Sequence, residues 1–143
     1  MIDFGLVDAV DGEAIGQPGR RTFRLRARSG DQYAALWMEK ESLAALGRSF
    51  STLLAERSRR RGRPAEPVEE MGPFPQHPQV EIQVARLGLD WDGQEEQIVI
   101  LADDAVALDR GDSPSFRMAI HRGQALRAIR QFQDVVSAGR PIC

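Results

Sequence analysis

The sequence predicts an α+β domain of two strand-strand-strand-helix repeats, with antiparallel sheet pairing and both helices packed on one side. Short stretches with period-two alternation are joined at residues 29–31 and 92–93 by turns too short to hold a helix, which excludes a doubly wound parallel fold. Two stretches with helical periodicity each follow a group of strands. A shift of about 82 or 83 residues superposes the second helix on the first without a gap.

The first half, residues 1–61, is expected to hold three strands and one helix. Residues 2–7 alternate as a short strand with Ile2, Phe4 and Leu6 on one face. The segment that follows is expected to be a loop ending in the turn at residues 16–19. Residues 22–28 and 32–38 alternate strictly and should form a hairpin. A helix is predicted from about Lys40, where leucines recur at helical spacing.

A Pro/Arg-rich linker at residues 62–78 is expected to separate the halves, because its prolines exclude regular structure before Val80. The second half, residues 79–139, begins with a strand that changes its apolar parity near residues 85–86, which predicts a β-bulge and a bend. Asp92-Gly93 predicts a hairpin turn.

Residues 98–101 are apolar on both faces, as expected of a central strand that is covered on both sides or by a subunit contact. Residues 116–120 form the sixth predicted strand. The last helix is expected to be striped by Leu126, Ile129, Phe132 and Val136 and to end at Gly139.

Composition indicates one soluble domain over residues 1–143. The chain has 42% hydrophobic and 28% charged residues, and a formal net charge of −2 gives no field that would attract it to nucleic acid or to a membrane. Cys143 is the single cysteine, so no intramolecular disulfide forms. The N-terminus lacks a secretory pattern and no apolar run is long enough to span a bilayer, so we expect a cytoplasmic protein.

No catalytic residue and no cofactor is predicted, and an enzyme is not favoured. The only histidines, His77 and His121, do not supply a triad or a histidine-rich metal site, and His121 is expected to cap the last helix. Nucleotide-phosphate and hydrolase motifs are absent from the sequence. Four carboxylates share one segment but lack the spacing of a calcium loop, so a solvated acidic loop is favoured over a metal site; they are Asp103, Asp104, Asp109 and Asp112.

Two groups of arginines are the most function-like features. One group lies in the helix tail and linker, where cations also compensate the helix dipole; it comprises Arg57, Arg59, Arg60, Arg61 and Arg63. The other group offers a plausible phosphate-binding surface along one sheet face and the preceding turn, or pairs with acidic neighbours across strands; it comprises Arg20, Arg21, Arg24, Arg26 and Arg28. Tyr33, Trp37 and Trp91 are expected to pack in the core rather than stack on bases.

We therefore carry two functional hypotheses. The first is a non-enzymatic binding or accessory module that presents a sheet face to a protein partner or to a second copy, with residues 98–101 as the supporting feature. The alternative is a single-stranded nucleic-acid or phospholigand binder that uses the arginine face of residues 22–28. The second half has no such arginine face, so the two predicted repeats differ in chemistry.

Several segments together resemble an uncharacterised bacterial family, the domain-of-unknown-function 3090 family, over nearly the whole chain. The segments that carry the resemblance are residues 16–23, 39–41, 67–70, 89–92 and 135–143. In that family Cys143 looks like the first residue of a C-terminal C-x-x-C and H-x-C tail, which implies a zinc site only in a form that carries the tail. A lone thiolate does not hold structural zinc, and the family implies no activity.

Overall fold

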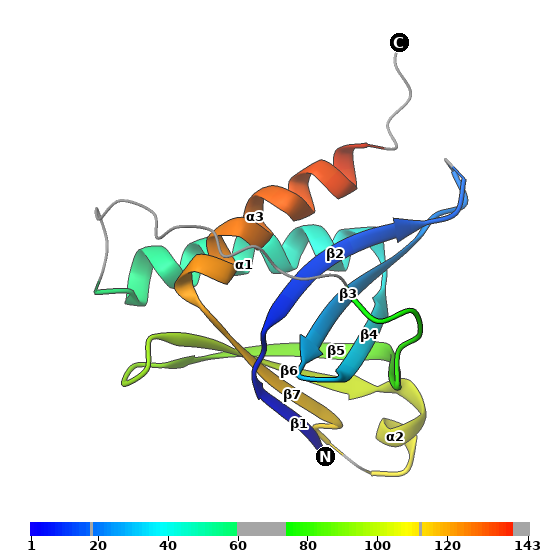
Figure 1. Ribbon diagram of the computed structural model, residues 1–143, viewed down its shortest axis with the longest axis horizontal. Coiled ribbons are helices and arrows are strands. Elements are labelled where there is room, and N and C mark those ends of the chain that lie inside the picture. Colours follow the sequence, from blue (N-terminus) through cyan, green and yellow to red (C-terminus); the bar gives the residue numbers. More distant parts are fainter. Residues whose placement is uncertain (18, 60–73, 112, 139–143) are drawn as a thin grey trace.

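A single seven-stranded sheet forms the body of the molecule, and its strand order differs from the chain order (Figure 1). The computed structural model describes residues 1–17, 19–59, 74–111 and 113–138. The strands and helices are β1 (Ile2–Leu6), β2 (Ala9–Ile15), β3 (Thr22–Ser29), β4 (Gln32–Met38), α1 (Lys40–Arg57), β5 (Val80–Asp92), β6 (Gln97–Asp104), α2 (Ala105–Asp109), β7 (Phe116–His121) and α3 (Arg122–Ser137). The strands pair in the order β1-β7-β6-β5-β4-β3-β2.

The α+β class is confirmed, but the sheet is mixed rather than antiparallel. Strands β2, β3 and β4 form one antiparallel meander followed by α1, and β5, β6 and β7 form a second followed by α3. The two meanders join through a parallel pair, β4 and β5, and β1 adds to β7 in parallel. A long connection that contains α1 separates β4 from β5, as parallel neighbours require. The internal repeat itself stays a prediction.

Strand β2 lies where the sequence predicted a loop. Its inward-facing residues include Gly12 rather than a large apolar side chain, which hides the period-two signal. The space is needed by the helices, because a Cβ added at Gly12 would lie 2.9 Å from Cδ1 of Phe132. The first meander therefore uses β2, and β1 belongs to the opposite edge of the sheet beside β7.

Strand β1 does not keep one apolar face, because its register shifts between Asp3 and Leu6. Gly5 adopts a positive φ of 60°, and its N–H donates to the Asp3 carboxylate at 2.8 Å. Phe4 is buried, whereas Ile2 and Leu6 are 44% and 47% exposed. The predicted alternation is wrong after Gly5 because the chain bulges there.

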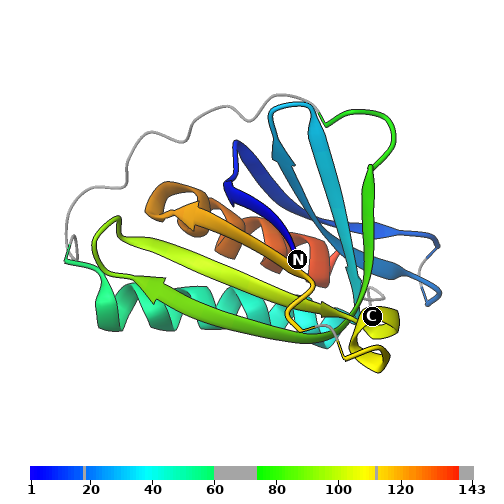
Figure 2. The ribbon, with the colours of Figure 1, turned by 90° about the horizontal axis from the view of Figure 1, so that it is seen from below.

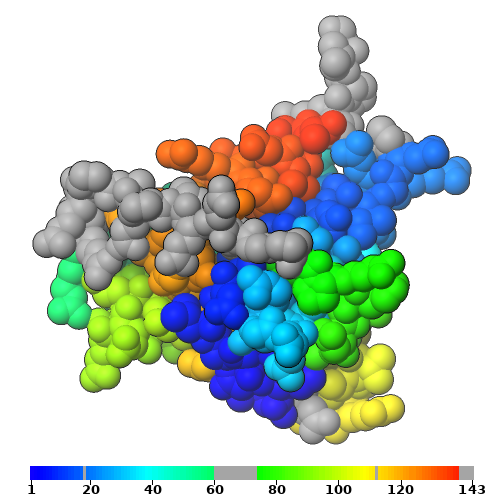
Figure 3. Space-filling view, in the orientation of Figure 1, coloured from blue at the N-terminus to red at the C-terminus, as the bar shows by residue number. Residues whose placement is uncertain are grey.

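The two edge strands, β1 and β2, follow each other in the chain, and the sheet curls strongly enough to bring these edges together (Figure 2). Val7 donates its N–H to Ala119 of β7 at 3.0 Å, and the next residue, Asp8, donates to Arg28 of β3 at 2.8 Å. The Ser29 hydroxyl donates to the Phe4 carbonyl at 3.3 Å, which ties β1 to the β3–β4 turn; the two lie together on the surface in Figure 3.

Helices α1 and α3 lie on the same side of the sheet, as predicted (Figure 1). The core they cover contains side chains from both halves, including Leu25, Leu36, Ile100 and Met118. The buried residues of α3 are Gln124, Ala125, Ala128 and Phe132. The expected stripe was only partly right, because Leu126, Ile129 and Val136 are half-buried at the edge of the core.

Several local predictions are confirmed. The register of β5 shifts between Val84 and Arg86, where a bulge was predicted. His121 caps α3 through Nδ1, which accepts the Gln124 N–H at 3.2 Å, and the Gln124 side chain completes a capping box. The short helix α2 was not predicted. No helix in the described ranges has the length and apolar content needed to cross a membrane.

Some predicted features fall outside the described residues. They are most of the linker 62–78, Arg60, Arg61, Arg63, Asp112, Gly139 and Cys143.

Candidate functional site

The arginines of β3 lie side by side on the outer face of the sheet, but each faces a carboxylate. The Arg24 guanidinium is 2.7 Å from Glu13, and Arg26 donates to both Asp11 oxygens at 2.6 and 2.8 Å. The side chains of these two arginines are only 15% and 21% exposed. Both carboxylates come from β2, a strand that the sequence did not predict. From the sequence, ion pairs across strands were therefore only one alternative, beside a phosphate-binding surface.

Aromatic rings further enclose this face. The Arg24 guanidinium lies 5.1 Å from the Trp37 ring, and Arg26 lies 4.2 Å from the ring of Phe74. Burial lowers the pKa of Arg26, but the hydrogen bond and charge of Asp11 outweigh that effect, so the net shift is upward and the guanidinium stays charged. Charge and geometry therefore favour a structural network of ion pairs between β2 and β3 over a phosphate-binding surface.

The predicted anion surface also includes Arg20, Arg21 and Arg28, of which only Arg28 shares the strand face of Arg24 and Arg26. Arg20 is exposed in the turn, where its N–H donates to Gln17 at 2.9 Å. Arg21 lines a hollow beside the start of α1, together with Trp37 and Glu39, and its buried Nε atom has no hydrogen-bond partner in the part of the chain that the structure describes. Arg28 is 4.0 Å from Asp8. The structure thus places Arg24, Arg26 and Arg28 on one face of β3 and leaves Arg20 and Arg21 elsewhere.

The acidic residues at the end of β6 make structural contacts. Asp104 accepts the N–H groups of Val106 and Ala107 and so caps α2, and it also accepts from Gln83 at 3.0 Å. Asp103 accepts from Arg86 at 3.0 Å and from the Ser113 hydroxyl at 2.7 Å. Across the described ranges no three His, Cys, Asp or Glu side chains are placed to hold a metal ion.

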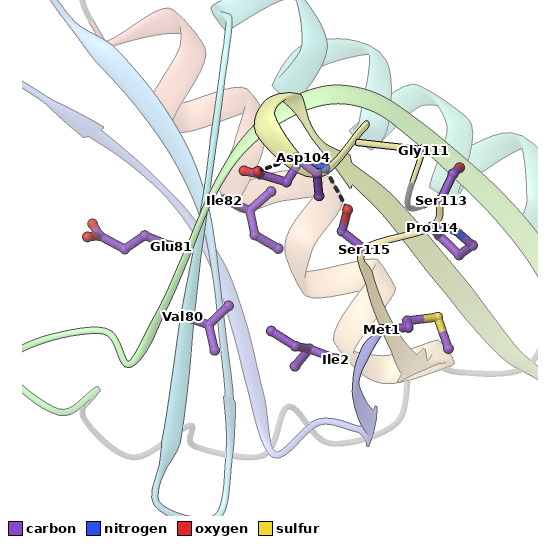
Figure 4. Close-up of a pocket in the computed structure, with 11 residues that line it drawn as sticks. Met1, Ile2, Val80, Glu81, Ile82, Asp104, Gly111, Ser113, Pro114 and Ser115 are labelled. Atoms are coloured by element: carbon purple, nitrogen blue, oxygen red, sulfur yellow. Dashed lines mark hydrogen bonds between the residues drawn. The ribbon is translucent and has the colours of Figure 1, made fainter. Parts of the chain in front are cut away.

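A hollow of about 640 Å³ opens between the start of β1, the start of β5 and the segment before β7 (Figure 4). Ile2, Val80 and Ile82 supply its apolar side, and in the close-up the Glu81 carboxylate points away from it. The Ser115 hydroxyl already accepts the Asp104 N–H at 3.0 Å. The polar groups here stabilise the loop and do not converge on an open point.

A more open feature is the edge of β5. This strand spans 13 residues, but β4 pairs only with residues 80–83, so the rest of that edge has no neighbouring strand within the described chain. The Trp91 N–H donates to the Asp90 carboxylate at 2.8 Å, from which we infer that it faces this edge and not β6. Because hydrogen-bonding direction alternates along an antiparallel strand, Leu87 and Leu89 likewise direct their backbone groups to this edge.

Helix α1 runs beside this edge, and a groove of about 260 Å³ lies between them. We call it the α1–β5 groove; it is lined by Ser42, Ala45, Leu46, Ser49, Val84, Ala85, Arg86, Leu87 and Leu89. At one end it continues into the hollow at Arg21, since Ser42 and Val84 line both. At the other end the Glu96 carboxylate accepts the Arg59 N–H at 2.7 Å, which fastens the end of α1 to the β5–β6 turn.

Elsewhere side chains cover part of each outer strand edge. On β2, the Gln131 side chain of α3 accepts the Gly12 N–H at 2.6 Å and donates to the Gly12 carbonyl at 2.5 Å. On β1, the Asp3 carboxylate covers the Gly5 N–H. Leu87 and Leu89 have no equivalent cap among the described residues, so β5 presents backbone donors and acceptors that a further strand would complete.

The fold and the groove together define a small α+β domain with an open strand edge flanked by a helix. A family model described as a protein of unknown function, DUF3090, matches residues 2–143. The chain therefore belongs to the DUF3090 family, which confirms the resemblance seen in the sequence. No curated protein and no solved structure matches it.

Proposed function

We propose that this protein is a cytoplasmic binding or accessory module that acts through protein–protein contact at the α1–β5 groove. The observation that carries the proposal is the edge of β5 beyond residue 83, which has no neighbouring strand among the described residues and where Leu87 and Leu89 offer backbone groups beside apolar side chains. The cytoplasm is the compartment we propose because a single cysteine in 143 residues suits a reducing environment.

The contact surface differs from the one suggested by the sequence. Residues 98–101 were expected to be covered on both sides or by a subunit contact; Ile98, Val99 and Ile100 are 1%, 7% and 0% exposed, whereas Leu101 is half-buried. Three of these four residues are therefore already covered within the chain. The edge of β5 takes its place as the feature that supports protein contact.

The nucleic-acid alternative has less support. Arg24 and Arg26 are held by carboxylates that would have to be displaced, and those carboxylates would repel a phosphate backbone. Tyr33, which was considered for base stacking, is 1% exposed.

A selection of random twelve-residue peptides displayed on phage tests the proposal, with the full chain as bait. Two serines of α1 give a matched pair, since both are exposed but Ser49 lines the α1–β5 groove and Ser51 lines the groove between α1 and α3. Selected peptides are expected to lose binding to Ser49→Arg and to keep it with Ser51→Arg. If no peptide is enriched, or if both variants bind equally, the proposed contact surface is wrong.

A further inference from the structure

We infer that the occupant of the α1–β5 groove is an extended peptide segment of a partner protein, which adds to β5 as an extra strand and carries charges matched to those beside the edge. This inference rests on the proposed function and specifies its partner. It follows from three properties of the edge: its backbone groups, its apolar wall and its charges.

The backbone groups define the conformation of the partner. Leu87 and Leu89 direct N–H and C=O groups to the open edge, and the bonds that complete a sheet are made only by an extended chain about 4.8 Å away. The open stretch from Val84 to Asp90 spans about 20 Å, which accommodates about seven residues of the partner. A helical partner would leave these backbone groups without hydrogen bonds.

The wall of α1 defines one set of partner side chains. Alternate side chains of an added strand point toward α1, where Ala45, Leu46 and the two leucines of β5 offer apolar surface. Ser42 and Ser49 are small residues on the same helix face and leave room for them. We therefore expect apolar residues at every second position of the partner.

Charges define the other set, which points to the outer face. Arg86 lies on that face, because it pairs with Asp103 of β6, and its side chain is 62% exposed with further N–H donors available. Asp90 stands four residues along the same row. Since oppositely charged residues favour directly facing positions, the partner should carry an acidic and a basic residue four positions apart, opposite Arg86 and Asp90.

A second copy of this chain is a poor occupant. If two β5 edges paired antiparallel, both α1 helices would lie on the same face of the joined sheet. Figure 2 shows α1 running along β5 and projecting beyond it, so the two helices would compete for the same space. A single strand avoids this conflict.

The test uses peptides selected as above and synthesised with a fluorescent label. Each is N-methylated at one position at a time, and its affinity for the full chain is measured by fluorescence anisotropy. Methylation at positions facing β5 removes one hydrogen bond and is expected to weaken binding about tenfold, whereas alternate positions change little. The amides of Leu87 and Leu89 are expected to become protected from hydrogen exchange when the peptide binds.

Charge exchange provides a second readout. Reversal of the acidic residue in the peptide is expected to weaken binding about threefold, and Arg86→Glu should restore the loss. Groove-dependent peptides without a period-two methylation pattern would overturn strand addition while leaving the proposed function standing. Failure to select groove-dependent peptides would overturn both, and a dimer in light scattering that Ser49→Arg dissociates would assign the edge to a second copy instead.

Discussion

The close approach of Gly12 to the helices gives a sharp test of how the core is packed. A Cβ at this position would lie 2.9 and 3.1 Å from two ring carbons of Phe132 and 3.2 Å from Cδ2 of Leu43, well inside the usual carbon–carbon contact of about 3.5–4.0 Å. Phe132 and Leu43 are 1% and 0% exposed, so neither moves aside without disturbing its neighbours. Gly12→Ala is therefore expected to lower the free energy of unfolding by about 1–3 kcal/mol.

Gly88 supplies the control, because it also lies in a strand but an added Cβ would meet only Cβ of Leu101, at 3.9 Å. Gly88→Ala is expected to be neutral or to stabilise by up to about 1 kcal/mol, since alanine restricts the unfolded chain. Urea unfolding followed by circular dichroism measures both variants. If Gly12→Ala proves as stable as Gly88→Ala, α1 and α3 do not pack on β2 as described.

Three further predictions address the ion pairs between β2 and β3, the cap of α3 and the covered edge of β2. Asp11→Ala leaves the partly buried Arg26 without its main partner and is expected to lower the free energy of unfolding in urea by about 1–3 kcal/mol. Neither the original chain nor this variant is expected to show salt-sensitive binding to an oligonucleotide. Arginine-dependent binding in the original chain would contradict the structural role. His121→Ala removes the cap of α3 and should cost about 1 kcal/mol, whereas His121→Asn should retain most of the stability. Gln131→Leu uncovers the Gly12 backbone and is expected to increase aggregation, measured by light scattering. Unchanged solubility would argue against the idea that Gln131 protects the edge of β2.

The sequence predicted local features of the fold well because they depend on neighbouring residues. Alternation identified the strands β3, β4, β5 and β7, and a run that is apolar on both faces identified β6. The parity change near residue 85 predicted the bulge in β5, and the position of His121 between strand and helix predicted its cap. Strand β2 escaped detection because its inward position at Gly12 is set by Phe132, more than a hundred residues away. A single sequence without the fold does not reveal that contact.

The candidate site was harder to predict for the same reason. The arginines of β3 stood out by their charge, but their partners on β2 became visible only with the register. The groove depends on a difference in strand length, since β5 continues beyond the end of β4. The long alternating stretch to Trp91 was a signal that β5 is long, but the sequence did not say which strand would lie beside it.

Amide hydrogen exchange of the protein alone shows whether the β5 edge beyond residue 83 is open. Fast exchange is expected at Leu87 and Leu89, whose N–H groups alternate in step with that of Trp91 and so face the edge, and slow exchange is expected at Gly88 and Asp90, whose N–H groups then face β6. Equal protection of all four amides from exchange would contradict an open edge, because the edge would then already be occupied.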